Sequence, residues 1–186
     1  WSICITASIA YAAGCDDQPL PPDQPTAQAS PSVSASPWLV DQAAAAGLGF
    51  TWQSGHDESF LMPEIVGGGV ALLDFDLDGD LDVYFAQGGN VSTAWQTPST
   101  NTATNQLFRN DGKLHFVNVT EATGTGDNGY GMGMAVGDID SDGDPDVYIT
   151  NAGRNTMLRN DNGAFTDVTE ESGTGHPGWG APALFF

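Results

Sequence analysis

The sequence predicts an all-β chain in which short strands form repeated hairpins, as in a β-propeller. Two nearly identical acidic strings support this fold class: DFDLDGDLDVY begins at Asp74, and DIDSDGDPDVY begins 64 residues later at Asp138. A longer stretch, residues 105–138, aligns with residues 155–186. The 24 glycines and 11 prolines favour turns and short strands over long helices. A repeat of this size, filled with short strands, is typical of a propeller-type array.

Residues 1–15 are expected to be an export signal. The segment WSICITASIAYAAGC is apolar, carries no charge and is too short to span a bilayer. Its end, AAGC, is similar to a bacterial lipobox, in which the cysteine is lipidated and becomes the mature N-terminus. We therefore expect a lipid on Cys15 and an exported protein, either a bacterial cell-envelope lipoprotein (periplasmic or at the cell surface) or a secreted one. The alternative is an ordinary signal peptide with an incidental cysteine.

Residues 16–37 are expected to be a disordered linker. They consist almost wholly of Pro, Ser, Ala, Gln and Asp, a composition that cannot bury a core and behaves as an extended spacer. The folded domain is then expected to span residues 38–186. Because Cys4 and Cys15 are the two cysteines of the chain, this domain depends on neither disulfides nor cysteine metal ligands.

Strands are expected on both sides of each acidic string. VALLDF and MAVGDI lead into the strings, and DVYFAQ and DVYITN lead out of them. These segments are rich in Val, Ile, Tyr and Phe and are bounded by Gly, Asn and Asp, so each acidic loop should connect two strands. A more divergent copy of the repeat is visible in WLVDQAAAAGLGF and VGGGVALLDFD. A helix, short at most, is expected only at residues 41–47.

A third copy of the repeat begins near the end of the sequence. Trp179-Gly180 holds the place that Tyr130-Gly131 holds before Asp138, so the next aspartate would fall one position past the last residue. The chain thus contains about two and a half repeats, whereas a closed propeller needs about 4–8 blades. We therefore expect an N-terminal fragment of a larger propeller.

The acidic loops have the spacing of a metal site. The pattern D-x-D-x-D-G-D-x-D offers carboxylates at positions 1, 3, 5 and 9 and a backbone carbonyl at position 7. That suits Ca²⁺, which takes about 6–8 oxygen ligands, better than Mg²⁺, which keeps several waters and takes few carboxylates. Gly79 and Gly143 at position 6 permit the sharp turn.

The alternatives to a calcium site are an EF-hand and a solvated acidic turn without an ion. An EF-hand would need a glutamate at position 12 and helices on both sides, but position 12 is Phe85 or Ile149. A solvated acidic turn without an ion would leave converging carboxylates to repel one another, by about 4 kcal/mol for a pair about 4 Å apart. The recurrence of the loop in register with the repeat favours the cation.

The acidic loops resemble the calcium motif of FG-GAP/VCBS repeats, which occur in integrin-like β-propellers. Residues 50–89 resemble more closely the cartilage acidic protein family, whose bacterial members are secreted and many of which carry a C-terminal ASPIC/UnbV domain; this chain contains no such domain. The resemblance covers about residues 38–186 and implies a seven- or eight-bladed propeller with Ca²⁺ in its hairpin loops. It implies side-chain ligands at Asp74, Asp76, Asp78, Asp82, Asp138, Asp140, Asp142 and Asp146, and backbone-carbonyl ligands at Asp80 and Asp144. One departure is Pro145, where the first loop has Leu81.

Other functions find less support in the sequence. The net charge of −20, with four basic residues, argues against nucleic-acid binding. GTGDNG (124–129) and GTGHPG (173–178) fit G-x-G-x-x-G, but they recur in the same slot of successive repeats and precede strands, so we interpret them as turns. His56 lies beside acidic residues without a known hydrolase motif, and we assign no catalytic residue.

The expected function is that of a calcium-binding extracellular module, not an enzyme, that engages a protein or glycan at the cell surface. Its contact with a membrane would run only through a lipid on Cys15. One alternative is a part of a secreted, polysaccharide-active enzyme whose catalytic residues lie outside this chain. Another is a spacer or scaffold.

Overall fold

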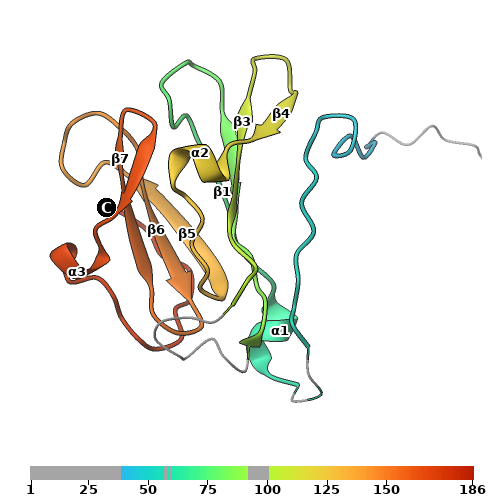
Figure 1. Ribbon diagram of the computed structural model, residues 1–186, viewed down its shortest axis with the longest axis vertical. Helices are drawn as coiled ribbons and strands as arrows, with labels where there is room; N and C mark the ends of the chain where they lie inside the picture. Colours follow the sequence, from blue (N-terminus) through green and yellow to red (C-terminus); the bar gives the residue numbers. More distant parts are fainter. Residues whose placement is uncertain (1–38, 57, 59, 92–100) are drawn as a thin grey trace, which may run out of the picture. The chain divides into compact units, whose positions relative to one another are not determined.

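Eight strands form two four-stranded antiparallel sheets within the part of the chain that the computed structural model describes, residues 39–56, 58, 60–91 and 101–186 (Figure 1). The first sheet contains, in order, β1 (Val70–Leu73), β2 (Asp82–Phe85), β3 (Gln106–Asn110) and β4 (Phe116–Asn118). The second contains β5 (Gly131–Gly137), β6 (Asp146–Asn151), β7 (Thr156–Asp161) and β8 (Ala164–Asp167). Each sheet is a meander of sequential strands, the form of one propeller blade, so the all-β prediction is confirmed.

The predicted export signal at residues 1–15, its cysteine Cys15 and the linker at residues 16–37 lie outside the described residues. Val40–Phe186 forms one unit. Among the described residues, no helix is both long enough and apolar enough to cross a membrane.

The described residues contain three short helices, and none lies where the sequence predicted one. They are α1 (Met62–Val66), α2 (Thr120–Thr123) and α3 (Thr169–Ser172). Residues 43–47 form turns instead, so the helix expected at residues 41–47 is wrong. One helical bond forms, from the N–H of Ala46 to the carbonyl of Gln42, but Gly47 then takes a φ of +84° and ends the turn.

Equivalent side chains of the two sheets make equivalent hydrogen bonds, which confirms the alignment of the repeats. Asn105 Oδ1 accepts from the backbone N–H of Gln87 at 2.6 Å, and Asn155 Oδ1 accepts from that of Asn151 at 2.9 Å. Two further pairs of bonds correspond: the hydroxyls of Tyr84 and Tyr148 donate to the carbonyls of Thr125 and Thr174, and the N–H groups of Leu107 and Met157 donate to the hydroxyls of Thr120 and Thr169.

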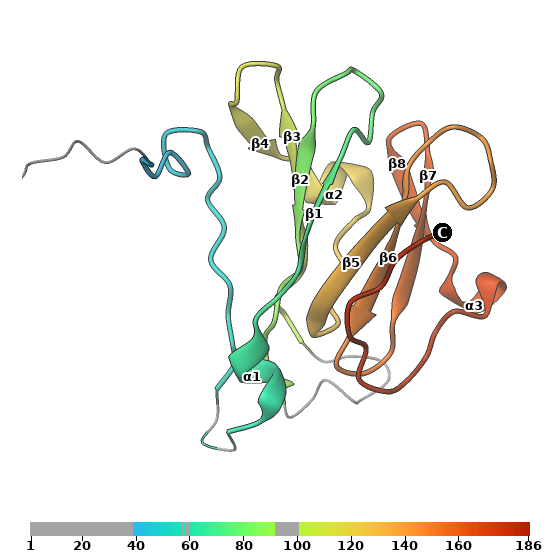
Figure 2. The ribbon, with the colours of Figure 1, turned by 180° about the vertical axis from the view of Figure 1, so that it is seen from behind.

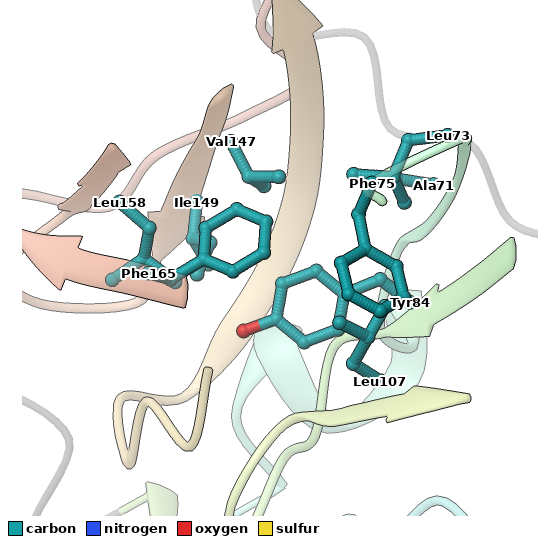
Figure 3. Packing of buried hydrophobic residues seen from close by; sticks show 9 residues of the cluster. All are labelled: Ala71, Leu73, Phe75, Tyr84, Leu107, Val147, Ile149, Leu158 and Phe165. Carbon is teal, nitrogen blue, oxygen red and sulfur yellow. The ribbon is translucent and has the colours of Figure 1, made fainter. Parts of the chain in front are cut away.

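The main hydrophobic core lies between the two sheets. Figure 3 shows side chains of the first sheet and its acidic loop facing those of the second. The rings of Phe75 and Phe165 lie 6.3 Å apart between their centroids. Burying a large apolar side chain contributes about 1.5–3 kcal/mol, so this contact holds the sheets together. Its buried members are Ala71, Leu73, Phe75, Tyr84, Leu107, Val147, Ile149, Leu158 and Phe165.

A polar network adjoins this core where the chain passes from the first sheet to the second. It centres on Asp127, in the glycine-rich turn 124–129 that precedes strand β5. Asp127 Oδ1 accepts from the hydroxyl of Thr156 at 2.9 Å. Its Oδ2 accepts from the N–H of Gly129 at 3.3 Å and from Asn151 Nδ2 at 3.4 Å. The carboxyl thus joins the turn to the second sheet.

The Asp127 carboxyl should make stability depend on pH. Desolvation raises its pKa above the usual 3.8, so the folded chain binds this proton more tightly than the unfolded chain. Its stabilising contribution is therefore complete below about pH 3.8 and is lost as the pH rises through the folded pKa. In chelator, we expect the wild type to lose stability relative to Asp127→Asn as the pH rises above about 3.8 and through the raised pKa of the folded chain. Urea unfolding measures the difference between the two proteins, and pH curves that run parallel would contradict the assignment.

Candidate metal centres

The two acidic loops occupy the same position in their sheets and have positive φ at the same two places. Residues 74–81 connect β1 to β2 and residues 138–145 connect β5 to β6, at the same end of the sheets (Figures 1 and 2). Positions 4 and 6 of each loop have positive φ, with values of +56°, +96°, +65° and +99° at Leu77, Gly79, Ser141 and Gly143. A Cβ at either glycine would meet nothing within 4 Å, so the backbone angle and not lack of space favours glycine there.

In the first loop three carboxylates converge. Asp74, Asp76 and Asp78 each place one carboxylate oxygen so that the three oxygens lie within 4.8 Å of one another. Asp74 is fixed by the backbone, since its two oxygens accept from the N–H groups of Asp78 and Gly79 at 3.0 Å each. Asp76 Oδ1 is buried and has no hydrogen-bond partner among the described residues. Desolvation and then the charge of Asp78 raise the pKa of Asp76.

In the second loop the converging carboxylates are those of Asp138, Asp140 and Asp146, again within 4.8 Å. Asp138 is also fixed by the backbone, since it accepts from the N–H groups of Ser141 at 2.7 Å and Gly143 at 3.0 Å. An arginine also lies near this cluster. Arg159 Nε is 3.8 Å from Asp140 Oδ2, and Nη2 is 3.0 Å from Asp161 Oδ2.

The aspartate at position 9 is buried in both loops but joins only one cluster. Asp82 accepts from the N–H of Phe75 at 3.1 Å and of Asn110 at 2.8 Å, and lies outside the first cluster. Burial is the main cause that raises the pKa of Asp82 to about 6. Asp146 belongs to the second cluster although its oxygens accept the equivalent bonds, from Ile139 and Asn160, both at 2.7 Å. Desolvation also raises the pKa of Asp146.

At position 5, the aspartate of the first loop joins its cluster and that of the second loop does not. Asp78 and Asp142 each accept from the backbone N–H two residues later, at 2.9 Å, yet only Asp78 joins its cluster. At position 7, where backbone carbonyls are predicted to bind, the side chains turn toward the neighbouring hairpin turns. Asp144 Oδ2 accepts from the N–H of Asn162 at 2.7 Å, and Asp80 Oδ2 lies where a Cβ on Gly112 would approach it to 2.7 Å.

Two buried asparagines that the sequence interpretation overlooked hold the position-9 aspartates. Asn110 and Asn160 donate their backbone N–H groups to Asp82 and Asp146. The signal for them was present, because they follow paired arginines in the repeated strings LFRND and MLRND. Recurrence at matching places in a repeat marks a shared structural task.

His56, which invited a catalytic interpretation, is paired with a carboxylate. Its Nδ1 lies 2.5 Å from Glu64 Oε2, and its ring centroid lies 4.9 Å from that of Phe60. Glu64 Oε1 also accepts from the N–H of Leu61 at 3.1 Å. This arrangement fastens the start of α1 to the segment before it.

The two clusters fit a hard divalent cation. Each gathers three carboxylates, the oxygen ligands that Ca²⁺ prefers. Like charges this close repel strongly unless a cation lies between them. The buried Asp76 Oδ1 adds an independent sign, because a buried carboxylate oxygen without a donor is costly and a bound cation would satisfy it. Both clusters could therefore hold a metal ion.

Comparison with known sequences agrees with the repeat. The profile of the FG-GAP-like repeat family matches residues 74–149 and again residues 138–185. Each match begins at the first aspartate of an acidic loop, and together they span more than half of the chain. No curated protein matches the sequence.

Proposed function

Because this chain belongs to the FG-GAP-like repeat family, we propose that it is a calcium-binding β-propeller module with one Ca²⁺ ion in each acidic loop. The observation that carries the proposal is the convergence of carboxylates at equivalent places in two repeats. The ligands would come from the clusters Asp74, Asp76, Asp78 and Asp138, Asp140, Asp146, with Asp82 and Asp142 completing the side-chain sets and Asp80 and Asp144 offering backbone carbonyls.

The role of the cation would be structural. Each loop joins two strands of one sheet, so an ion that holds its carboxylates together also holds the ends of these strands in place. Asp74 and Asp138 are already oriented by backbone N–H groups, which lowers the ordering required on binding.

Calcium titration tests the proposal directly. Isothermal calorimetry of the full chain should show two Ca²⁺ ions per molecule, with dissociation constants of about 10⁻⁴ to 10⁻³ M, the range of extracellular modules. Asp74→Ala and Asp138→Ala should each remove one ion, because each removes a carboxylate from a different loop. Mg²⁺ at the same concentration is the matched control and should bind more weakly. Absence of calcium binding in this range would exclude the function.

We further propose that the module acts outside the cytoplasm, by binding a protein or glycan at the cell surface and not by catalysis. The support is the export-like sequence of residues 1–15, which ends in the lipobox-like string AAGC, and the sequence of residues 50–89, which resembles the cartilage acidic protein family. A lipid on Cys15 would be part of this proposal. The net charge of −20 disfavours nucleic acid as the partner. Retention on immobilised surface glycans or proteins that is lost in chelator would support this role, and retention unaffected by chelator would separate it from the calcium sites.

A further inference from the structure

One buried asparagine contacts both acidic loops. Asn160, in β7, is 0% exposed. Its backbone N–H donates to Asp146 Oδ1 in the second loop's cluster at 2.7 Å. Its side-chain Nδ2 donates to the backbone carbonyl of Phe75 at 2.8 Å. Its Oδ1 accepts from the N–H of Gly163 at 2.8 Å, so both side-chain polar groups and the backbone N–H have partners.

The contact with Phe75 reaches the centre of the first loop. Phe75 lies between Asp74 and Asp76, two members of the first cluster. The hairpin turn at Gly163 lies against the same place, since a Cβ on Gly163 would be 3.8 Å from the Asp76 Cβ. Asn160 of the second sheet thus holds the backbone of the first loop, and the turn between β7 and β8 lies beside Phe75 and the Cβ of Asp76.

The equivalent residue of the first sheet does not bridge loops. Asn110 also donates its backbone N–H to the position-9 aspartate, Asp82, at 2.8 Å. Its side-chain Nδ2, however, donates to the carbonyl of Leu81 at 3.2 Å, in the acidic loop of its own sheet. Two asparagines at the same place in the repeat therefore make different connections.

We propose that the two cation sites are thermodynamically coupled through Asn160, so that Ca²⁺ in one loop raises the affinity of the other. A cation held by Asp74 and Asp76 fixes the backbone of Phe75 between them, and this carbonyl holds the Asn160 side chain. An ordered Asn160 in turn presents its N–H to Asp146. The second cation then binds a loop that has less ordering left to undergo. The inference rests on the proposed function, because it requires calcium in both loops.

The test compares each site alone with both sites together. Calorimetry with CaCl₂ on the full-length Asp138→Ala chain gives the affinity of the first loop, and Asp74→Ala gives that of the second. In the wild type, the overall association constant for two Ca²⁺ ions should exceed the product of the two single-site association constants. The expected ratio is about fivefold or more, the lower end of typical coupling. Equality would show independent sites and would overturn the proposal.

Asn160→Ala is expected to bring the ratio of the overall association constant to this product close to one. The substitution removes the bond to Phe75 and keeps the backbone N–H that binds Asp146. Asn110→Ala is the matched control: it removes a bond from β3 to the acidic loop of the same sheet, so it should weaken that site and leave the ratio of the overall constant to the product unchanged. A ratio that stays at the wild-type value in Asn160→Ala, or that falls equally in both variants, would overturn the assignment to Asn160.

The outcomes separate this inference from the proposed function. If neither loop binds calcium, the proposed function fails; if both bind and the overall constant equals the product, only the coupling fails. The wild-type comparison does not depend on whether Asn160→Ala folds. Asn160→Asp, which keeps the size of the side chain but replaces its donor with an acceptor, provides a second variant and should also lose the excess.

Discussion

Saturating calcium is expected to stabilise the chain by about 2.7 kcal/mol for each occupied loop, once the free cation exceeds its dissociation constant about a hundredfold. The stabilisation arises because the folded state alone gathers three carboxylates within 4.8 Å of one another. Without the cation these charges repel, and Asp76 keeps a buried oxygen without a partner. For a domain of about 150 residues, the shift corresponds to about 5–10 °C in melting temperature per site.

Differential scanning calorimetry in calcium and in chelator measures this shift. Asp74→Ala should remove the part of the melting-temperature shift that comes from the first loop. The double variant Asp74→Ala with Asp138→Ala should show no calcium-dependent shift. Glu121→Ala takes one negative charge from an exposed position of α2, outside the loops, and should retain the full calcium shift. A wild-type melt unmoved by calcium, or a shift that survives in the double variant, would exclude the acidic loops as the stabilising site.

Phe75→Ala is expected to destabilise the chain by about 3–5 kcal/mol, the usual range for a buried aromatic residue. Phe75 is 4% exposed and packs in the core between the sheets, where it contacts Phe165. Truncation would leave a cavity at the contact that joins the first acidic loop to the second sheet.

Ile139→Ala is the matched control for Phe75→Ala, because Ile139 follows the first aspartate of the second loop as Phe75 follows that of the first. Ile139 is 40% exposed and lines an open groove with Tyr148 and Met157, so its truncation should change stability by less than about 0.5 kcal/mol. Urea unfolding in chelator measures both variants. Similar losses in the free energy of unfolding for Phe75→Ala and Ile139→Ala would show that the packing of Phe75 between the sheets does not supply the expected stabilisation.

The sequence alone determined the strands, the acidic loops and the repeat. These features are local: alternating apolar residues, a glycine at position 6 and aspartates on every second position all act within one hairpin. The paired positions Asn105 and Asn155 could be aligned from the sequence, and the structure gives them the same bond. The sequence also indicated a helix at residues 41–47, but Gly47 ends that segment after one turn.

The tertiary structure decided which aspartates converge. The two acidic strings have the same pattern, yet Asp78 joins the first cluster at position 5 and Asp146 joins the second at position 9. Differences of this size depend on what each loop packs against. The first loop is covered by Phe165 and the turn at Gly163, whereas Ile139 of the second lines an open groove.

The tertiary structure also decided the different roles of two identical asparagines. The repeated strings LFRND and MLRND make Asn110 and Asn160 equivalent in sequence. Asn160 nevertheless reaches Phe75, 85 residues away, because the second sheet packs against the first loop. Within the described residues, the first sheet has no acidic loop on its corresponding side, so the Asn110 side chain bonds to the acidic loop of its own sheet. A repeat determines which groups a residue can offer, and the packing of one sheet on the next determines which partner receives them.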